Sequence, residues 1–117
     1  TLDFGPEGRA GISLFDAQPR ALPYLLEMVE RHPDGSQAFL PLHQNSWLIT
    51  VAEPGETPGR VHAFVARDGQ GVNYHRGTWH GVLTPLQAPG LFAVVDRIGD
   101  TPNLQEHWLQ TPLLIVL

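Results

Sequence analysis

The chain has 117 residues, of which 42% are hydrophobic and 16% charged, so it can bury one core and is too apolar to be disordered. Its net charge of −5 argues against binding to nucleic acid or to an anionic membrane surface, and no apolar run reaches the ~18 residues of a membrane span. All seven basic residues are Arg and there is no Cys, which excludes lysine Schiff bases, thiol catalysis and thiolate metal sites.

Short apolar runs alternate with turn signals along the whole chain. Twelve Gly and eleven Pro supply these signals, and no stretch keeps helical periodicity for three turns. Residues 22–31 are the best helical candidate, but they carry a Pro near the start and have a strand as the alternative. The runs predict eight strands, at residues 11–15, 24–32, 37–42, 46–52, 60–66, 81–85, 91–96 and 112–117. Short strands at this spacing are typical of an all-β sandwich or barrel in one domain.

The first chemically informative segment surrounds the Pro-Asp-Gly turn signal at residues 33–35. We expect a hairpin with a four-residue loop, in which His32 stands opposite Gln37 and Glu30 opposite Phe39. Because side chains two apart in a strand share a face, one face would carry Met28, Glu30, His32, Gln37 and Phe39. An apolar face with a few polar groups is typical of a cavity wall, whereas Arg31 would point away from it. The alternative is a solvent-exposed hairpin end.

The second segment covers residues 69–81 and holds three groups that can bind an anion or move a proton, namely Tyr74, Arg76 and His80. Its glycines do not form a phosphate loop, because the third Gly and the following helix of that motif are missing. We expect a turn just before Gly77.

At these two segments the chain resembles the ureidoglycolate lyases of allantoin catabolism, formerly called ureidoglycolate hydrolases. The matching stretches are residues 30–33, 37–42 and 69–80, with shorter matches at 63–64 and 95–97. The similarity runs from about residue 11 to the end of the chain. Members of this family carry some tens more residues before the point where this chain begins. The resemblance therefore implies one cupin-like domain over residues 1–117 that lacks an N-terminal portion.

The family is similar in fold to the cupins, which are jelly-roll barrels built as a double-stranded β-helix. A typical cupin binds a divalent metal with a His-x-His-x4-Glu hairpin and a further His on a later strand. These positions fall here on Glu30, His32, Gln37 and His80, so two of the ligand types are changed. The resemblance implies a divalent ion such as Ni²⁺, Mn²⁺ or Zn²⁺ at these residues. An acid–base site without metal is the alternative.

The resemblance also implies the reaction, the cleavage of (S)-ureidoglycolate to glyoxylate and urea. A base must take the proton of the hydroxyl group, and an acid must protonate the leaving urea nitrogen. Histidine suits both tasks because its pKa lies near neutrality. We expect His32 and His80 to be the catalytic pair, with Glu30 as an alternative base or as the group that orients a histidine.

The substrate carboxylate needs a cation, which in this chain must be an arginine. Arg76 is the first candidate and Arg97 the second, while Gln37 would bind the urea group and Tyr74 the carboxylate or the hydroxyl. Three other functions stay open: an amidohydrolase that releases ammonia, another metal-dependent cupin enzyme such as an oxygenase or isomerase, and a cupin that only binds small acids. The resemblance further implies a cytoplasmic homodimer.

Overall fold

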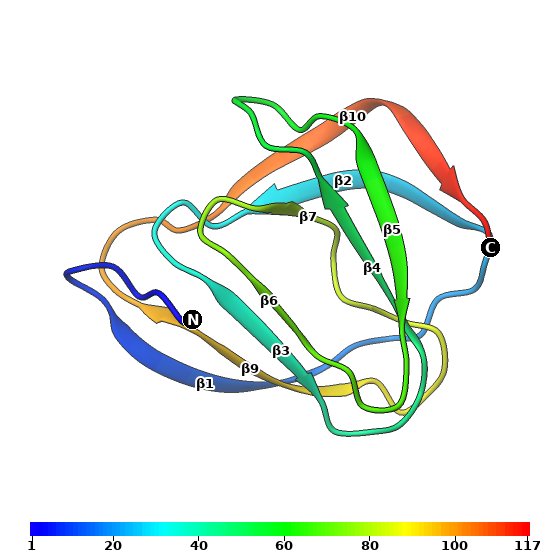
Figure 1. Ribbon diagram of the computed structural model, residues 1–117, viewed down its shortest axis with the longest axis horizontal. Helices are drawn as coiled ribbons and strands as arrows, with labels where there is room; N and C mark the ends of the chain where they lie inside the picture. The colour runs from blue at the N-terminus through cyan, green and yellow to red at the C-terminus, as the bar shows by residue number, and fades with distance from the viewer.

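The computed structural model describes residues 1–117 and contains ten strands and no α-helix (Figure 1). The strands are β1 (Arg9–Asp16), β2 (Tyr24–Arg31), β3 (Gln37–Pro41), β4 (Trp47–Ala52), β5 (Val61–Ala66), β6 (Val72–Tyr74), β7 (Trp79–His80), β8 (Thr84–Pro85), β9 (Leu91–Ile98) and β10 (Gln105–Ile115). No element of the structure qualifies as a helix that could cross a membrane. The all-β prediction is confirmed.

The strands form two antiparallel sheets with a cupin-like, jelly-roll arrangement. The four-stranded sheet has the order β1-β9-β3-β6 and occupies the lower part of Figure 1. The six-stranded sheet has the order β10-β2-β7-β4-β5, with β8 also paired to β4, and curves over the upper part. Most neighbours in these sheets are distant in sequence, so residues far apart along the chain meet between the sheets.

The predicted strands are present, and the structure adds others. Residues 22–31 contain a strand and not a helix, and the region 53–60 is a loop as its Pro and Gly content indicates. The run at 81–85 holds only the two-residue β8. The strands β6 and β7 and most of β10 were not expected, because β6 and β7 are too short to show a period and β10 alternates polar with apolar residues irregularly.

The predicted hairpin of residues 30–39 is wrong. A turn does form at residues 33–34, but it carries the chain from β2 in the six-stranded sheet to β3 in the four-stranded sheet. Glu30 lies opposite His80 and Glu106, while Gln37 lies opposite Tyr74 and Asp96. The Pro-Asp-Gly sequence dictates a change of chain direction but not which strands pair across it.

Strand β4 separates two hydrophobic cores, which explains its nearly continuous apolar sequence. Trp47 packs with Phe92 at 5.0 Å between ring centroids, in the core shared by the two sheets. Leu48, the next residue, faces the second core with Leu26 and Val29. Alternate residues of β4 are thus buried on opposite faces, and this strand and its neighbour β7 form a rigid wall beside the site described next.

Candidate active site

Three side chains that can accept a proton or a metal ion converge between the sheets. One ligand atom from each of Glu30, His32 and His80 lies within 4.8 Å of the others. Glu30 on β2 is directly opposite His80 on β7, and His32 follows the end of β2. The two imidazole rings lie 5.2 Å apart between centroids. The structure therefore brings together residues from both segments that the sequence singled out.

Both histidines are held in the same tautomer. The Nδ1 of His32 lies 2.8 Å from the carbonyl oxygen of Asn103, and the Nδ1 of His80 lies 2.9 Å from that of Gly81. Because a carbonyl oxygen only accepts, each Nδ1 carries the proton, which leaves each neutral Nε2 with a free lone pair. Both Nε2 atoms are buried and have no hydrogen-bond partner. The site thus offers two oriented acceptors that are free to take a proton or a metal ion.

The surroundings of His80 keep it neutral. Its ring stacks on the Tyr74 ring with 4.1 Å between centroids and an interplanar angle of 3°. The pKa of His80 is lowered to about 4, mainly by burial and also by nearby His32, while the hydrogen bond to the Gly81 carbonyl acts in the opposite direction. Burial, together with the charge of Glu30, raises the pKa of the Tyr74 phenol, so this group stays protonated. His80 is therefore suited to act as a base or ligand and Tyr74 as a donor.

The pKa of Glu30 is shifted upward, in the opposite direction to that of His80. Desolvation is the largest cause of its raised pKa, nearby Glu106 on β10 adds to it, and His32 opposes it. Burial of this kind favours the protonated carboxyl group. The raised pKa makes Glu30 a better proton donor than an ordinary carboxyl group.

Gln37 is buried in the other sheet, next to the residue that covers His80. It lies on β3 opposite Tyr74, whose ring covers His80, and it is 7% exposed. Its Nε2 donates to Asp96 at 3.1 Å, while its Oε1 is buried without a partner. The sequence indicates Gln37 on the basis of a hairpin that does not form, but the residue is nevertheless buried in the interior.

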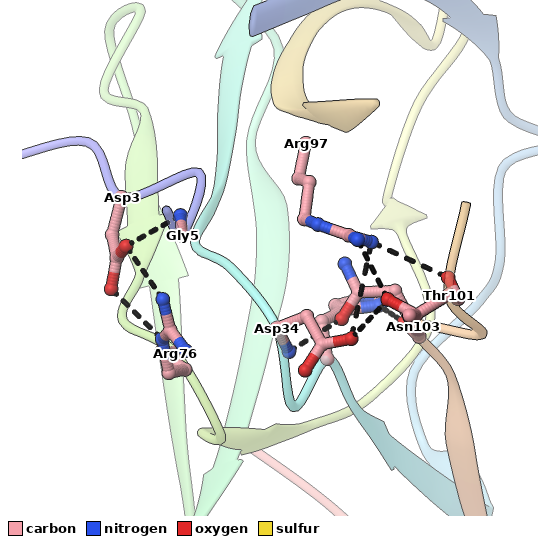
Figure 2. A network of polar contacts seen from close by, with 8 residues as sticks. Asp3, Gly5, Asp34, Arg76, Arg97, Thr101 and Asn103 are labelled. Carbon is pink, nitrogen blue, oxygen red and sulfur yellow. Dashed lines mark hydrogen bonds and ion pairs between the residues drawn. The ribbon is translucent and has the colours of Figure 1, made fainter. Parts of the chain in front are cut away.

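The two predicted carboxylate anchors lie in a different place, shown in Figure 2. Arg76 donates from Nε and Nη2 to the two carboxylate oxygens of Asp3, at 2.9 and 2.8 Å. This contact, with a hydrogen bond from the Gly5 amide, lowers the pKa of Asp3 to about 2. Arg97 donates to Thr101 at 2.6 Å, and its side chain is only 5% exposed.

Both arginines line a cavity of about 210 Å³ whose other walls are Gly5, Pro6, Glu7, Asp34 and Thr101. Glu30, His32 and His80 do not line it. The link between the two regions is Asn103, whose carbonyl oxygen accepts from His32 and whose side chain accepts from the Asp34 amide at 2.7 Å. The sequence indicates neither Asn103 nor Asp3. Each of them contacts a partner that is more than sixty residues away in sequence, and no local pattern indicates such a contact.

Arg31 points away from the cluster, as strand alternation predicts. Its guanidinium lies 4.3 Å from the centroid of the Trp79 ring and donates to Gln105 and to the Gly55 carbonyl. Trp79 itself packs in the second core. These two residues therefore support the outer side of β2 and β7 and take no part in the site.

The cluster fits a divalent cation. Three ligand atoms bound to one ion at about 2.1 Å lie roughly 3.0–3.6 Å from one another. The cluster, whose ligand atoms lie within 4.8 Å of one another, would therefore have to contract around the ion. The buried, unpartnered Nε2 atoms supply the lone pairs, and the backbone carbonyls on each Nδ1 are the outer partners that metal-bound histidines usually have. Glu30, His32 and His80 are the residues that would hold the ion.

A jelly-roll of two antiparallel sheets with two histidines and a carboxyl group converging inside defines a cupin-like enzyme. The family model "Ureidoglycolate lyase" matches residues 1–116, almost the whole chain. The chain belongs to the ureidoglycolate lyase family.

Curated relatives agree with this assignment. A ureidoglycolate lyase of Rhodobacter capsulatus is 61% identical over 115 residues, which are 97% of this chain and 71% of that protein. Ureidoglycolate lyase 2 of Rhizobium meliloti is 49% identical over 92% of this chain and 67% of its own length. The corresponding protein of Mesorhizobium japonicum is 52% identical over 87% of this chain and 63% of its own length. The chain thus spans about two thirds of these relatives.

Proposed function

We propose that the protein is a carbon–nitrogen lyase that cleaves (S)-ureidoglycolate to glyoxylate and urea. Family membership and the names of the relatives support this reaction. The observation that carries the mechanism is the pair of buried, unpartnered Nε2 atoms beside Glu30. The reaction consumes no water, and a buried site suits it, whereas an amidohydrolase would have to admit and activate a water molecule.

The proton movements follow from the tautomers. One histidine Nε2 accepts the hydroxyl proton as the carbonyl of glyoxylate forms and the C–N bond breaks. The leaving nitrogen takes a proton from the Glu30 carboxyl group, whose raised pKa suits a donor. The proton on the histidine then returns to Glu30, so that the enzyme is unchanged and urea leaves neutral. The lowered pKa of His80 weakens it as a base. We therefore assign the hydroxyl proton to His32, whose Nε2 is also buried without a partner.

A divalent ion held by Glu30, His32 and His80 would supply Lewis-acid polarisation of the substrate hydroxyl. In that case we assign the proton for the leaving nitrogen to Tyr74, whose ring stacks on His80 and whose phenol is kept protonated by burial. The choice of Ni²⁺, Mn²⁺ or Zn²⁺ stays a prediction.

Arg76 is our candidate for the substrate carboxylate. Its two-point contact with the Asp3 carboxylate supports this role, because the guanidinium fork already binds one carboxylate. The substrate would replace Asp3, which belongs to the segment that precedes β1. Arg97 is less accessible and is already bound to Thr101.

The test is turnover of (S)-ureidoglycolate, with glyoxylate, urea and ammonia measured together before and after chelation. Equal amounts of glyoxylate and urea support the lyase, and ammonia with little urea would favour the amidohydrolase. His32→Gln should lower the rate at least about 100-fold, which is the usual scale of general base catalysis. The matched control is His62→Gln, since His62 is exposed and paired with Glu53 on the outside of the molecule.

We also propose a homodimer formed through the outer face of the four-stranded sheet. Ile12 and Leu14 on β1 are 77% and 67% exposed, and the register places Leu14 and Leu40 on the same face. An apolar cavity of about 400 Å³ adjoins them on β3 and β6. Sedimentation analysis should give twice the chain mass, and Ile12→Glu should give the monomer. The cytoplasmic location stays a prediction.

A further inference from the structure

His32, His80 and Gln37 each have one buried side-chain atom without a hydrogen-bond partner, and all three atoms are acceptors. Two are the Nε2 atoms of His32 and His80, and the third is Oε1 of Gln37. Gln37 lies opposite Tyr74 in the four-stranded sheet, and the Tyr74 ring stacks on His80. The proposed substrate carries a ureido group with three N–H donors. The two Nε2 atoms belong to the catalytic cluster, so the unpartnered oxygen of Gln37 is the acceptor left to match the donor-rich end of that substrate.

The orientation of the Gln37 amide depends on one neighbour. A glutamine can present either its oxygen or its NH₂ group to a given side. Here the Nε2 donates to Oδ2 of Asp96 at 3.1 Å, and a carboxylate can only accept. Asp96 lies directly opposite Gln37 in the register of β9 and β3, so the contact is built into the sheet. The opposite amide orientation would place two oxygens face to face.

We infer that Asp96 is a positioning residue that turns the carbonyl oxygen of Gln37 toward the ureido group of the substrate; this inference rests on the proposed function. Gln37 touches the substrate, and Asp96 acts only through Gln37. The pair then selects for a terminal NH₂ group, because a ligand without that donor leaves the buried Oε1 unsatisfied.

Two unreactive ligands isolate this effect. N-carbamoylglycine keeps the ureido group and the carboxylate but lacks the hydroxyl, and N-acetylglycine replaces its terminal NH₂ with a methyl group. Calorimetric titration of the wild-type chain should show tighter binding of N-carbamoylglycine. Asp96→Asn lets both amide orientations of Gln37 coexist, so this preference should fall about fivefold, the ratio given by one ordinary hydrogen bond. In turnover, KM should rise while kcat changes little.

A charge-conserving exchange supplies the rescue. Gln37→Glu alone sets two carboxylates against each other and should abolish the preference. In Gln37→Glu with Asp96→Asn, the new amide donates to the new carboxylate, whose second oxygen again faces the site as an acceptor. The preference should return in the double variant, which a merely structural contact does not predict.

The outcomes of these experiments distinguish the positioning role of Asp96 from the proposed lyase reaction. An undiminished preference in Asp96→Asn, or a double variant no better than Gln37→Glu alone, overturns the inference. A variant that keeps the preference but loses affinity for Zn²⁺ overturns it as well, since Gln37 would then serve an ion. A wild-type chain that binds N-carbamoylglycine selectively, loses this selectivity in Asp96→Asn and yet never cleaves ureidoglycolate would support the inference while refuting the proposed lyase reaction.

Discussion

Gly81 offers a way to displace His80, a member of the candidate site, without replacing it. This glycine follows His80, accepts from its Nδ1, and donates its own amide to the Thr50 carbonyl at 3.0 Å. A Cβ at this position would overlap Oγ1 of Thr50 and approach Leu26 within 3.3 Å. Thr50 and Leu26 are both buried and cannot move aside freely. Because Gly81 has no positive φ, the overlap is the only reason for alanine to be unfavourable.

We therefore expect Gly81→Ala to lower the free energy of unfolding by about 1–3 kcal/mol, the usual cost of overpacking. The displaced carbonyl would also move the His80 ring, and a shift of about 1 Å in a catalytic group costs roughly 100-fold in rate. Unfolding by guanidinium chloride, followed by tryptophan fluorescence, measures the first effect; urea is unsuitable because it is the proposed product. Turnover measures the second.

The second-site change Thr50→Ala removes the overlapping hydroxyl group. The double variant should be more stable than Gly81→Ala alone and should regain most of the lost rate, with a coupling of at least ~0.5 kcal/mol between the two sites. If Gly81→Ala is as stable and active as the wild type, or if Thr50→Ala restores nothing, the close packing described for β4 and β7 is wrong.

Other predictions concern pH, the anchor and the core. The folded-state pKa of His80 lies below its value of about 6.5 in the unfolded chain, so the unfolded state takes up the proton first and stability falls as the pH drops from 6.5 toward 4. In metal-free protein, the free energy of unfolding of the wild type should fall by about 2 kcal/mol relative to that of His80→Asn between pH 7 and pH 5, as measured by denaturation curves. A difference between the two proteins that does not change with pH would contradict the burial of His80. Asp3→Asn should lower KM for ureidoglycolate without changing kcat by releasing Arg76, and an unchanged KM would remove Arg76 as the anchor. Phe92→Ala should cost about 3–5 kcal/mol in thermal unfolding, against under about 1 kcal/mol for the exposed Phe64→Ala.

The sequence predicted the fold class better than the pairing of strands. Repeated turn signals and short apolar runs were enough for an all-β molecule, because they depend on local chain chemistry. Pairing depends on which surfaces are buried together, and here the Pro-Asp-Gly turn joins two sheets instead of two neighbours in one sheet. Glu30 and Gln37 consequently lie in different sheets, although the sequence suggested that they share one face of a single hairpin.

The candidate site was predictable as a set of residues but not as a geometry. Resemblance to a family singled out Glu30, His32 and His80, and the structure places their ligand atoms close together. The tautomers were not predictable, because they depend on backbone carbonyls, and that of Asn103 lies 71 residues from its histidine in sequence. The Arg76 prediction could not anticipate Asp3, whose contact spans 73 residues.

The crossing from β2 to β3 has a consequence for how the molecule loses function. It leaves Glu30, His32 and His80 with the six-stranded sheet and places Gln37 and Tyr74 in the four-stranded sheet. The packing of Trp47 against Phe92 helps to set the spacing of the two layers. The distance from the catalytic cluster to Gln37 and Tyr74 therefore depends on the gap between the layers. A substitution that widens this gap would lower the activity of the enzyme while every strand remained paired. On heating, activity should therefore be lost at a lower temperature than secondary structure.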